Sequence, residues 1–336
     1  MKVLRLHGTG DLRLHDEPPP VPGPGEALLR VCAVGLCGSD RHWYLEGSIG
    51  DATLTRPLVL GHEFSCSIET GRRAGERVAV DPAIPCGRCS SCRAGNRNLC
   101  VRTRFAGHGV TDGALRELVA WPAELLCPLP DSLSDAEGAL LEPLGVALHA
   151  LDLAHVRPGG TGAVCGCGPL GLLLVQLLRS LGTATIIATD VVPHRVAAAK
   201  SMGATHAIDT RAGSRSELGP AAAETGGVDV AFEVAGDDLA IEDAIALLRP
   251  GGRLVLLGIP MHDRSGFTAS AARRKGLTIM MCRRMKGTDL PRAAALAERQ
   301  FVRLGPLVSE QRKLDEAPAA FEFLAARRGL KTVVRP

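Results

Sequence analysis

The sequence predicts a two-domain α/β protein, in which a β-rich domain precedes a domain built on a doubly wound parallel sheet. The chain has 336 residues, more than one hydrophobic core usually spans. Residues 25–129 carry short apolar runs separated by glycine, proline, asparagine and aspartate, as expected of strands and turns. From residue 162 apolar strands alternate with helical runs, and repeated strand–helix–strand units favour parallel pairing.

Each expected element follows from its local apolar pattern. A stop-and-turn signal, Arg249-Pro250-Gly251-Gly252, follows the last helix of the α/β region. From about residue 285 come two helical patterns and a strand at 332–335, and we expect this segment to pack on the first domain. The other predicted strands are 27–34, 77–80, 116–126, 163–165, 186–189, 206–208, 228–234, 254–257 and 277–282, and the helices are 169–181, 195–202 and 239–248.

Composition limits the classes of function. With 46% hydrophobic and 22% charged residues the chain is typical of globular proteins, which excludes a mainly disordered state. Aromatic residues make up only 3%, so the core consists of aliphatic side chains and a base-stacking surface for nucleic acid is not expected. The net charge of +3 indicates no polyanionic partner. A small molecule is therefore the expected partner, and nucleic acid is not.

The N-terminal region and the cysteines indicate the compartment. Charges occur throughout the first residues, so we expect no signal peptide. The apolar stretch 161–178 contains four glycines, a proline and Gln176, which favours a strand, turn and helix over a membrane span. Four of the eleven cysteines lie within fifteen residues, which favours metal binding in a reducing environment. We expect a cytoplasmic protein with no membrane association.

The four clustered cysteines have the spacing of a structural metal site. Cys86, Cys89, Cys92 and Cys100 form C-x2-C-x2-C-x7-C. Zinc takes four thiolates at ~2.3 Å in a tetrahedron, and short spacings allow the backbone to fold around the ion. A 4Fe–4S cluster also uses such spacings, but no proline follows the last cysteine. We predict a closed, structural zinc site at about residues 86–100.

A glycine-rich turn predicts a dinucleotide site. Gly166-Cys167-Gly168-Pro169-Leu170-Gly171 is G-x-G-x-x-G, placed between an apolar strand and a helix. The first glycine permits the turn, the second lets a pyrophosphate approach the backbone, and the third lets helix and strand pack closely. The phosphates then bind at the positive N-terminus of the helix.

The cofactor is predicted from the end of the next strand. Asp190 closes the segment IIATD, 19 positions after Gly171, where a carboxylate can accept from the adenosine ribose hydroxyls. A carboxylate there also repels a 2′-phosphate, which favours NAD over NADP. Arg195 could approach such a phosphate, although we expect it to cover the adenine face. We predict cofactor contacts from the glycine turn, Asp190 and Arg195.

Further metal-binding residue types are spread along the first domain. Cys37 lies in GLCGSD, His62 and Glu63 lie in LGHEF, and Glu142 follows an apolar run. A thiolate, an imidazole and one carboxylate leave a coordination position open, as catalytic zinc requires. These residues are far apart, so spacing alone does not show that they form one site.

Together the motifs resemble those of a known family. GLCGSDRHWYLEGSIGD, PLVLGHE, the four-cysteine segment, DGALRELV, LEPLGVALHAL and VCGCGPLGLL occur in this order. This order is similar to the zinc-dependent medium-chain dehydrogenases, in particular to their sorbitol and polyol dehydrogenase branch. The resemblance covers essentially the whole chain. It implies a GroES-like catalytic domain formed by residues 1–144 and 285–336, and a Rossmann NAD-binding domain formed by residues 145–284.

The resemblance also implies roles for individual residues. Cys37 and His62 match ligands of the catalytic zinc, with Glu63 or Glu142 as the third protein ligand. Two zinc ions per chain, one catalytic and one structural, are therefore expected. Ser39 and His42 match a proton relay from the substrate hydroxyl toward water.

The resemblance also implies contacts with the substrate. Trp43 stands where relatives place a tyrosine that touches polyols, and Arg283 or Arg284 matches a polyol-contacting arginine. Phe105 is expected to line the pocket. A homo-oligomer, either dimer or tetramer, is expected from the resemblance alone, with a homotetramer favoured.

We therefore predict NAD-dependent oxidation of a secondary alcohol on a polyol or sugar-like substrate, giving a ketone. One alternative keeps this chemistry but acts on threonine, butanediol, an aldose or an aminocyclitol. Another is a zinc- and NAD-binding protein that has lost catalysis and serves a structural role.

Overall fold

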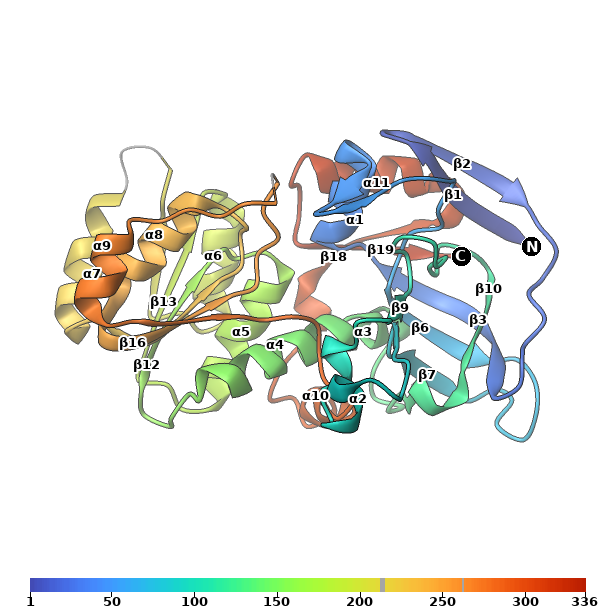
Figure 1. The fold of residues 1–336 in the computed structure, drawn as a ribbon, viewed down its shortest axis with the longest axis horizontal. Coiled ribbons are helices and arrows are strands. Elements are labelled where there is room, and N and C mark those ends of the chain that lie inside the picture. The colour runs from blue at the N-terminus through green and yellow to red at the C-terminus, as the bar shows by residue number, and fades with distance from the viewer. Residues whose placement is uncertain (212–214, 262) are drawn as a thin grey trace. The chain divides into compact units, whose positions relative to one another are not determined.

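Two compact units make up the chain in this computed structural model, which describes residues 1–211, 215–261 and 263–336. Unit 1 comprises Met1–Gly145 and Met285–Pro336, and unit 2 comprises Val146–Arg284. Both chain ends lie in unit 1, where the blue and red ends of the ribbon meet (Figure 1). The second unit is therefore inserted into the sequence of the first.

A seven-stranded sheet is the framework of unit 1. Its strands run in the order β11-β7-β6-β3-β19-β18, and β10 also pairs with β3. Antiparallel pairing places Val334 of β19 opposite Val34 of β3, which brings the C-terminal strand into the middle of the sheet. The strands are β3 (Glu26–Gly35), β6 (Glu63–Ile68), β7 (Arg77–Val80), β10 (Leu118–Pro122), β11 (Leu126–Pro128), β18 (Val308–Lys313) and β19 (Lys331–Arg335).

The core of unit 1 is mainly aliphatic, as the composition predicts. β6 is buried along almost its whole length because it lies between two other strands. Phe64 and Trp121 add an edge-to-face aromatic pair with ring centroids 6.1 Å apart. Burying one large apolar side chain contributes ~1.5–3 kcal/mol, so this core provides most of the stability of the unit.

Short elements surround this sheet. The expected strand 116–126 is wrong in its length: β10 ends at Pro122, which has no N–H to donate, and the chain continues as a 3-10 turn at Ala123–Leu125. The other elements of unit 1 are β1 (Lys2–Gly8), β2 (Asp11–Asp16), α1 (Gly38–Glu46), β4 (Ser48–Ile49), β5 (Ala52–Thr53), β8 (Ala83–Ile84), α2 (Ser90–Arg93), β9 (Arg104–Phe105), α3 (Asp135–Ala139), α10 (Asp289–Glu298) and α11 (Ala317–Ala325). Helix α4 (Leu141–Ala154) runs across the boundary between the two units in the sequence.

Unit 2 contains the doubly wound parallel sheet that the sequence predicts. The strand order is β14-β13-β12-β15-β16-β17, and all its pairings are parallel. The order reverses between β12 and β15, because the chain first proceeds to β13 and β14 and then crosses to β15. The strands are β12 (Thr161–Cys165), β13 (Thr185–Asp190), β14 (His206–Asp209), β15 (Val228–Glu233), β16 (Leu248–Leu256) and β17 (Thr278–Met281).

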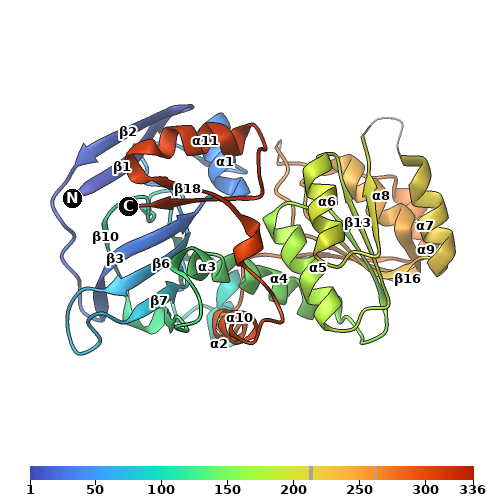
Figure 2. The same cartoon turned by 180° about the vertical axis from the view of Figure 1, so that it is seen from behind.

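Helices cover both faces of this sheet. Helices α5 (Pro169–Ser180) and α6 (Pro193–Ser201) cover one face, and they lie in front of the sheet in Figure 2. Helix α8 (Asp238–Leu247), with α7 (Leu218–Thr225) and α9 (Ala269–Lys275), covers the other. The sequence did not predict α7 and α9, because glycine and proline in α7 and a basic run in α9 obscure the apolar period.

The turn expected at Arg249–Gly252 lies within β16 instead of before it. The register between β15 and β16 breaks there, since Val228 pairs with Leu248 but Val230 pairs with Arg253. The extra residues form a bulge in β16, and Gly251, at φ 75°, permits the turn of the backbone there.

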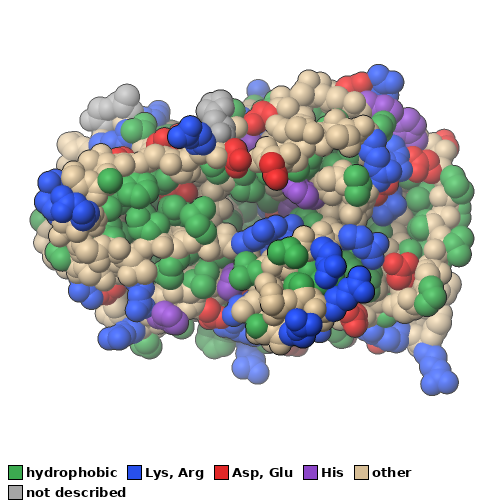
Figure 3. Space-filling model, in the orientation of Figure 1, with side chains coloured by type: hydrophobic (Ala, Val, Ile, Leu, Met, Phe, Trp, Pro, Cys, Tyr) green, Lys and Arg blue, Asp and Glu red, His purple; other side chains and the backbone are tan. Residues whose placement is uncertain are grey.

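Charged side chains of both signs are interspersed over the face in Figure 3, in keeping with the small net charge. None of the helices in the described part of the chain has the length and apolar character that a membrane span requires.

Candidate functional site

Three predicted metal ligands lie together in unit 1. Cys37, His62 and Glu63 each offer a donor atom, and these atoms lie within 4.8 Å of one another. Cys37 follows β3 as the N-cap of α1, and His62 and Glu63 stand at the start of β6. Because β3 and β6 are antiparallel, with Gly35 opposite Glu63, the end of one strand meets the start of the other. The sheet pairing therefore assembles the cluster.

Two members of the cluster are buried, Cys37 is half-buried, and acidic groups are in excess around them. His62 is 6% and Glu63 1% exposed. Burial raises the pKa of the Cys37 thiol to about 12, and the nearby Glu63 carboxylate adds to this effect. Burial also raises the pKa of Asp40, whose carboxylate is fully enclosed. Negative charge is unfavourable here without a cation to balance it.

Glu142 is a fourth acidic group near this cluster. It lies in the first turn of α4 and is 6% exposed. Burial raises its pKa to about 8, with further contributions from Glu63 and Cys37, while His62 opposes them. Among the described residues, its oxygens are not part of the group of three mutually close donors.

Lys331 is a partner of the site that the sequence analysis missed. Its Nζ donates to Glu63 Oε2 at 2.5 Å and to the carbonyl of Leu36 at 2.9 Å. Burial disfavours its charged form, but Glu63 and Cys37 overcome that effect and its pKa is raised. No local signal could have identified this pair, since 268 residues separate its members in the sequence.

Asp40 holds the segments that carry the ligands. Its Oδ2 accepts from the Cys37 N–H at 2.9 Å, and its Oδ1 accepts from the Gly61 N–H at 3.2 Å. Asp40 Oδ1 also lies 3.7 Å from His62 Nδ1, on the side of the ring away from Ser39. This contact is too long for a hydrogen bond, so Asp40 acts through its two bonds to the backbone of the ligand-bearing segments. Asp40 is the third residue of a helix that begins after Cys37, and an acidic residue at that position could have indicated that it bonds to the Cys37 backbone.

The two predicted relay residues lie on α1. Ser39 Oγ is 3.4 Å from His62 Nε2, which places the hydroxyl beside the metal cluster. His42 is 9% exposed, and its Nδ1 lies 2.8 Å from Glu46 Oε1 one helical turn away. Glu46 therefore orients the His42 ring.

A series of rings extends from the cluster. The Phe105 ring centroid is 5.2 Å from that of His62, so Phe105 is placed where a pocket wall is expected. His108 packs edge-on against Phe105 at 6.5 Å and against Trp43 at 5.5 Å. Trp43 is 1% exposed within the core of unit 1, so the structure places it behind His108 and not at an accessible surface. His108 was not predicted.

Two other predicted residues lie in unit 2. Arg283 and Arg284 follow β17, and Arg284 has a positive φ of 55°. Their contact with substrate stays a prediction.

The four-cysteine segment forms a second donor group. The sulfur atoms of Cys86, Cys89, Cys92 and Cys100 lie within 4.8 Å of one another. Helix α2 begins directly after Cys89, and the Cys86 N–H donates to the Cys100 sulfur at 3.2 Å. Hydrogen bonds from the backbone N–H groups of Arg88 and Cys89 lower the pKa of Cys86 to about 6. The bond from the Cys86 N–H contributes to the lowered pKa of Cys100. All eleven cysteines are free thiols.

The glycine turn in unit 2 is built by close backbone contacts. Gly166 has φ 106°, and a Cβ there would lie 2.8 Å from the Ala235 nitrogen. A Cβ at Gly171 would lie 1.9 Å from the Gly166 oxygen, so only glycine fits. Gly168 caps α5, with Pro169 and Leu170 in its first turn. The turn and helix have the geometry of a phosphate-binding N-terminus.

Asp190 braces this turn. Its Oδ2 accepts from the Cys167 N–H at 2.7 Å and its Oδ1 from the Val192 N–H at 2.8 Å. A carboxylate has about four acceptor positions, so two remain for a ribose. Arg195 in α6 reaches the same turn, because its Nη1 is 3.7 Å from where a Cβ of Gly168 would lie.

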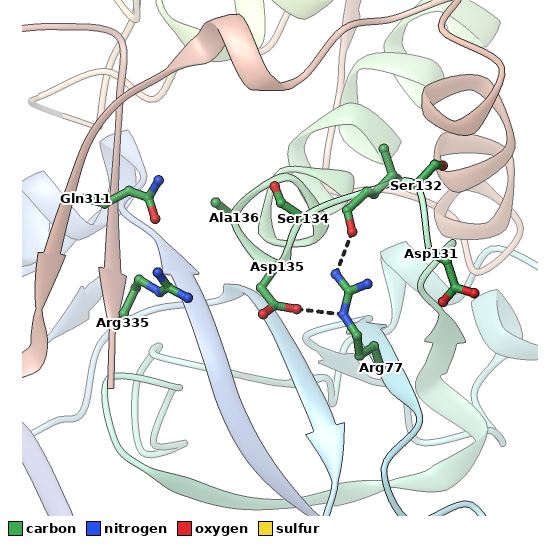
Figure 4. Close-up of a pocket in the computed structure, with 9 residues that line it drawn as sticks. Arg77, Asp131, Ser132, Ser134, Asp135, Ala136, Gln311 and Arg335 are labelled. Atoms are coloured by element: carbon green, nitrogen blue, oxygen red, sulfur yellow. Dashed lines mark hydrogen bonds and ion pairs between the residues drawn. The ribbon is translucent and has the colours of Figure 1, made fainter.

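A polar hollow elsewhere on unit 1 contains none of the predicted site residues. Figure 4 shows Arg335 and Gln311 on one side of it, facing Arg77 and Asp135. Arg77 Nε donates to Asp135 Oδ1 at 2.9 Å, and Arg77 Nη2 donates to the Leu133 carbonyl. These bonds tie the sheet to the segment before α3.

Known proteins match both units. Residues 23–131 match the family described as alcohol dehydrogenase GroES-like domain, and residues 169–299 match the zinc-binding dehydrogenase family. A sorbitol dehydrogenase of Bacillus subtilis (strain 168) is 39% identical over 269 residues, which cover 78% of this chain and 76% of that protein. "Probable D-xylulose reductase A" of Neosartorya fischeri is 36% identical, over 98% of this chain and 95% of its own length.

The chain belongs to the zinc-dependent alcohol dehydrogenase superfamily. A solved structure supports the same assignment: a zinc-binding dehydrogenase of Sinorhizobium meliloti 1021, bound to NADP, aligns with a TM-score of 0.90 and 32% identity over 100% of this chain and 99% of its own. The predicted family and its fold of a GroES-like domain with a Rossmann domain are thus confirmed, and the protein is an oxidoreductase.

The donors suit the metal of this superfamily. Zinc prefers sulfur, nitrogen and carboxylate ligands, and unit 1 presents all three types at one buried point. The surplus of buried acid over the single lysine favours a divalent cation at that point.

Two glycine variants of this dehydrogenase should separate packing from cofactor contact. Gly171→Ala forces a clash with the Gly166 carbonyl, so we expect both stability and NADH affinity to fall. Gly168→Ala has only the end of Arg195 within 4 Å, so the melting temperature should stay near that of the wild type. Its methyl group nevertheless obstructs a pyrophosphate, and NADH affinity should fall ~10-fold or more. Equal NADH affinity in Gly168→Ala and wild type, measured by calorimetry, would reject the assigned turn.

Proposed function

We propose that this dehydrogenase oxidises a secondary hydroxyl of a polyol to a ketone, with NAD as the hydride acceptor. The observation that carries the proposal is the close group of Cys37, His62 and Glu63 with the Ser39 hydroxyl beside it. The names of its relatives, sorbitol dehydrogenase and D-xylulose reductase, support a polyol as the substrate class.

Cys37 and His62 are the proposed protein ligands of a catalytic zinc, together with one glutamate. Glu63 is favoured as the third ligand because its carboxylate belongs to the group of three close donors, and Glu142 is the alternative. When bound, zinc supplies a Lewis acid for an alcohol oxygen. The four cysteines hold a second, structural zinc in this proposal, which makes two ions per chain.

The residues of α1 move the proton. Oxidation of an alcohol releases one hydride to the nicotinamide and one proton, and the Ser39 hydroxyl stands beside the metal group to accept that proton. His42 lies on the same helix and is oriented by Glu46, so it is the proposed next acceptor on the way to water. Asp40 accepts from the N–H groups of Cys37 and Gly61 and so keeps the ligand-bearing segments in place during this transfer.

Asp190 is proposed to select NAD. An Asp190→Asn variant keeps one acceptor for the backbone but loses the charge that repels a 2′-phosphate. We expect its ratio of kcat/KM for NAD over NADP to fall by ~10-fold or more, since hydrogen bonds to charged groups contribute about 1.5–3 kcal/mol. An unchanged ratio in steady-state kinetics would remove Asp190 from cofactor selection.

NADH formation across a panel of polyols, sugars, diols and amino alcohols tests the proposed activity. Turnover should be highest with polyols. A preference for threonine, butanediol, an aldose or an aminocyclitol would correct the substrate class. No turnover with any alcohol, in protein that holds zinc, would favour a structural role.

Two further proposals concern the assembly and the compartment. A homodimer or homotetramer is proposed from the superfamily. The four cysteines clustered within fifteen residues, in the spacing of a metal site, support a reducing compartment such as the cytoplasm.

A further inference from the structure

A buried carboxylate at the end of β15 has no role in the chemistry proposed above. Glu233 is 1% exposed, and its Oε1 accepts from the N–H groups of Ala235 and Gly236, each at 2.7 Å. Both amides belong to the loop that follows β15. A buried charge is costly unless hydrogen bonds compensate it, so its presence here calls for a reason.

Glu233 stands where three loops meet at the carboxyl edge of the sheet. A Cβ on Gly166, after β12, would lie 2.8 Å from the Ala235 nitrogen. A Cβ on Gly258, after β16, would lie 2.0 Å from the Gly236 nitrogen and 2.7 Å from Glu233 Oε2. The loops after β12, β15 and β16 are therefore in backbone contact around one carboxylate.

The main chain of Glu233 reinforces this arrangement. Its carbonyl accepts from the N–H groups of Leu257 and Gly258, at 2.8 and 3.2 Å. The N–H of Val234 donates to the Cys165 carbonyl at 2.8 Å, directly before the glycine turn. The Glu233 backbone thus connects the end of β15 to the loop after β16. The backbone of Val234 connects the loop after β15 to β12.

The strand order shows which half of a dinucleotide these loops serve. In a doubly wound sheet the ligand crosses the carboxyl edge where the order reverses, here between β12 and β15. Asp190, at the end of β13, marks the side of the adenosine half. The loops after β15 and β16 lie on the opposite side of the reversal, where the second mononucleotide half binds.

We infer that Glu233 is a positioning residue that shapes the platform for the nicotinamide half of the cofactor. The inference rests on the proposed dinucleotide function of unit 2, but not on the identity of the alcohol. It assigns no contact between Glu233 and the cofactor. The carboxylate acts through the Ala235 and Gly236 amides, which it holds in one arrangement.

The test compares two ligands by calorimetry with the zinc-loaded enzyme. NADH contains both mononucleotide halves, whereas ADP contains only the adenosine and the pyrophosphate. In Glu233→Ala the NADH dissociation constant should rise about tenfold or more, because the Ala235 and Gly236 amides lose the carboxylate that holds them in place. The ADP dissociation constant should stay within about twofold of the wild type, since ADP lacks the second mononucleotide half that the loops after β15 and β16 would contact.

Two variants serve as controls. Glu233→Gln keeps an amide oxygen for Ala235 and Gly236, so its NADH affinity should lie between that of the wild type and that of Glu233→Ala. Asp229→Asn alters a carboxylate at the other end of β15, which accepts from the Thr161 N–H at 2.8 Å and from Arg249 Nε at 2.7 Å. That variant should leave the ratio of the two dissociation constants unchanged.

A second readout uses the cofactor-free protein. Hydrogen exchange at the Ala235 and Gly236 amides should be faster in Glu233→Ala than in wild type. Equal weakening of NADH and ADP, or weakening of neither, would overturn the inference. If Glu233→Ala does not fold, the same comparison with Glu233→Gln decides. The dissociation constant of NADPH is measured beside that of NADH, so a wrong cofactor preference is recognised separately. A wild type that oxidises no polyol is recognised from its turnover and leaves these binding comparisons intact.

Discussion

Replacing either Cys37 or His62 by alanine should abolish turnover while NADH still binds. Each variant removes one donor from the group whose atoms lie within 4.8 Å, so the zinc site loses a ligand. Zinc activation contributes several kcal/mol to such reactions, which corresponds to a loss in kcat of ~10³-fold or more. The glycine turn belongs to unit 2, so the NADH dissociation constant should change little. Steady-state kinetics and calorimetry measure the two quantities.

Cys32→Ala is the matched control for Cys37→Ala. Cys32 lies on β3, five residues before Cys37, and belongs to neither donor group. Its variant should keep the activity of the wild type. Retained turnover in both Cys37→Ala and His62→Ala would show that the alcohol is oxidised without this site.

Lys331→Met should lower the free energy of unfolding by about 3–5 kcal/mol, because one partner of a buried ion pair is lost. Lys331 and Glu63 have side chains that are only 2% and 1% exposed, so no water replaces the lost ammonium group. The Leu36 carbonyl loses its donor as well. Tryptophan fluorescence in a urea titration isolates unit 1, since both tryptophans of the chain, Trp43 and Trp121, lie in its core.

Lys2→Met tests whether burial of the ion pair is the cause of the lost stability. Lys2 Nζ lies 2.7 Å from Asp16 Oδ2, but its side chain is 49% exposed. Solvent screens such a pair, so we expect no measurable shift in the urea midpoint. If Lys331→Met unfolds at the same urea concentration as Lys2→Met, the Glu63–Lys331 pair is not a determinant of stability.

Local patterns predicted most of unit 2 and the four-cysteine donor group. The strand order follows from the alternation of strands and helices, and the three glycines of the turn are required by contacts that a Cβ would violate. The four cysteines lie within fifteen residues, so their spacing alone restricts them to one site. For Cys37, His62 and the glutamates, spacing carried little information, and family resemblance was needed to join them.

The missed residues act across long sequence separations or through the backbone. Lys331 reaches Glu63 only because β19 inserts beside β3, and no pattern near residue 331 indicates this pairing. Glu233 is a single acidic residue at a strand end, and its role depends on three loops that meet there. His108 belongs to a ring series whose members come from α1, β9 and the following loop.

The zinc content of the purified protein tests the central claim most directly. Elemental analysis of the wild type should find two zinc ions per chain, with one lost in His62→Ala and the other lost in Cys100→Ser. A wild type that holds a single zinc ion, kept in His62→Ala and lost in Cys100→Ser, would contradict the claim that Cys37 and His62 form the catalytic centre.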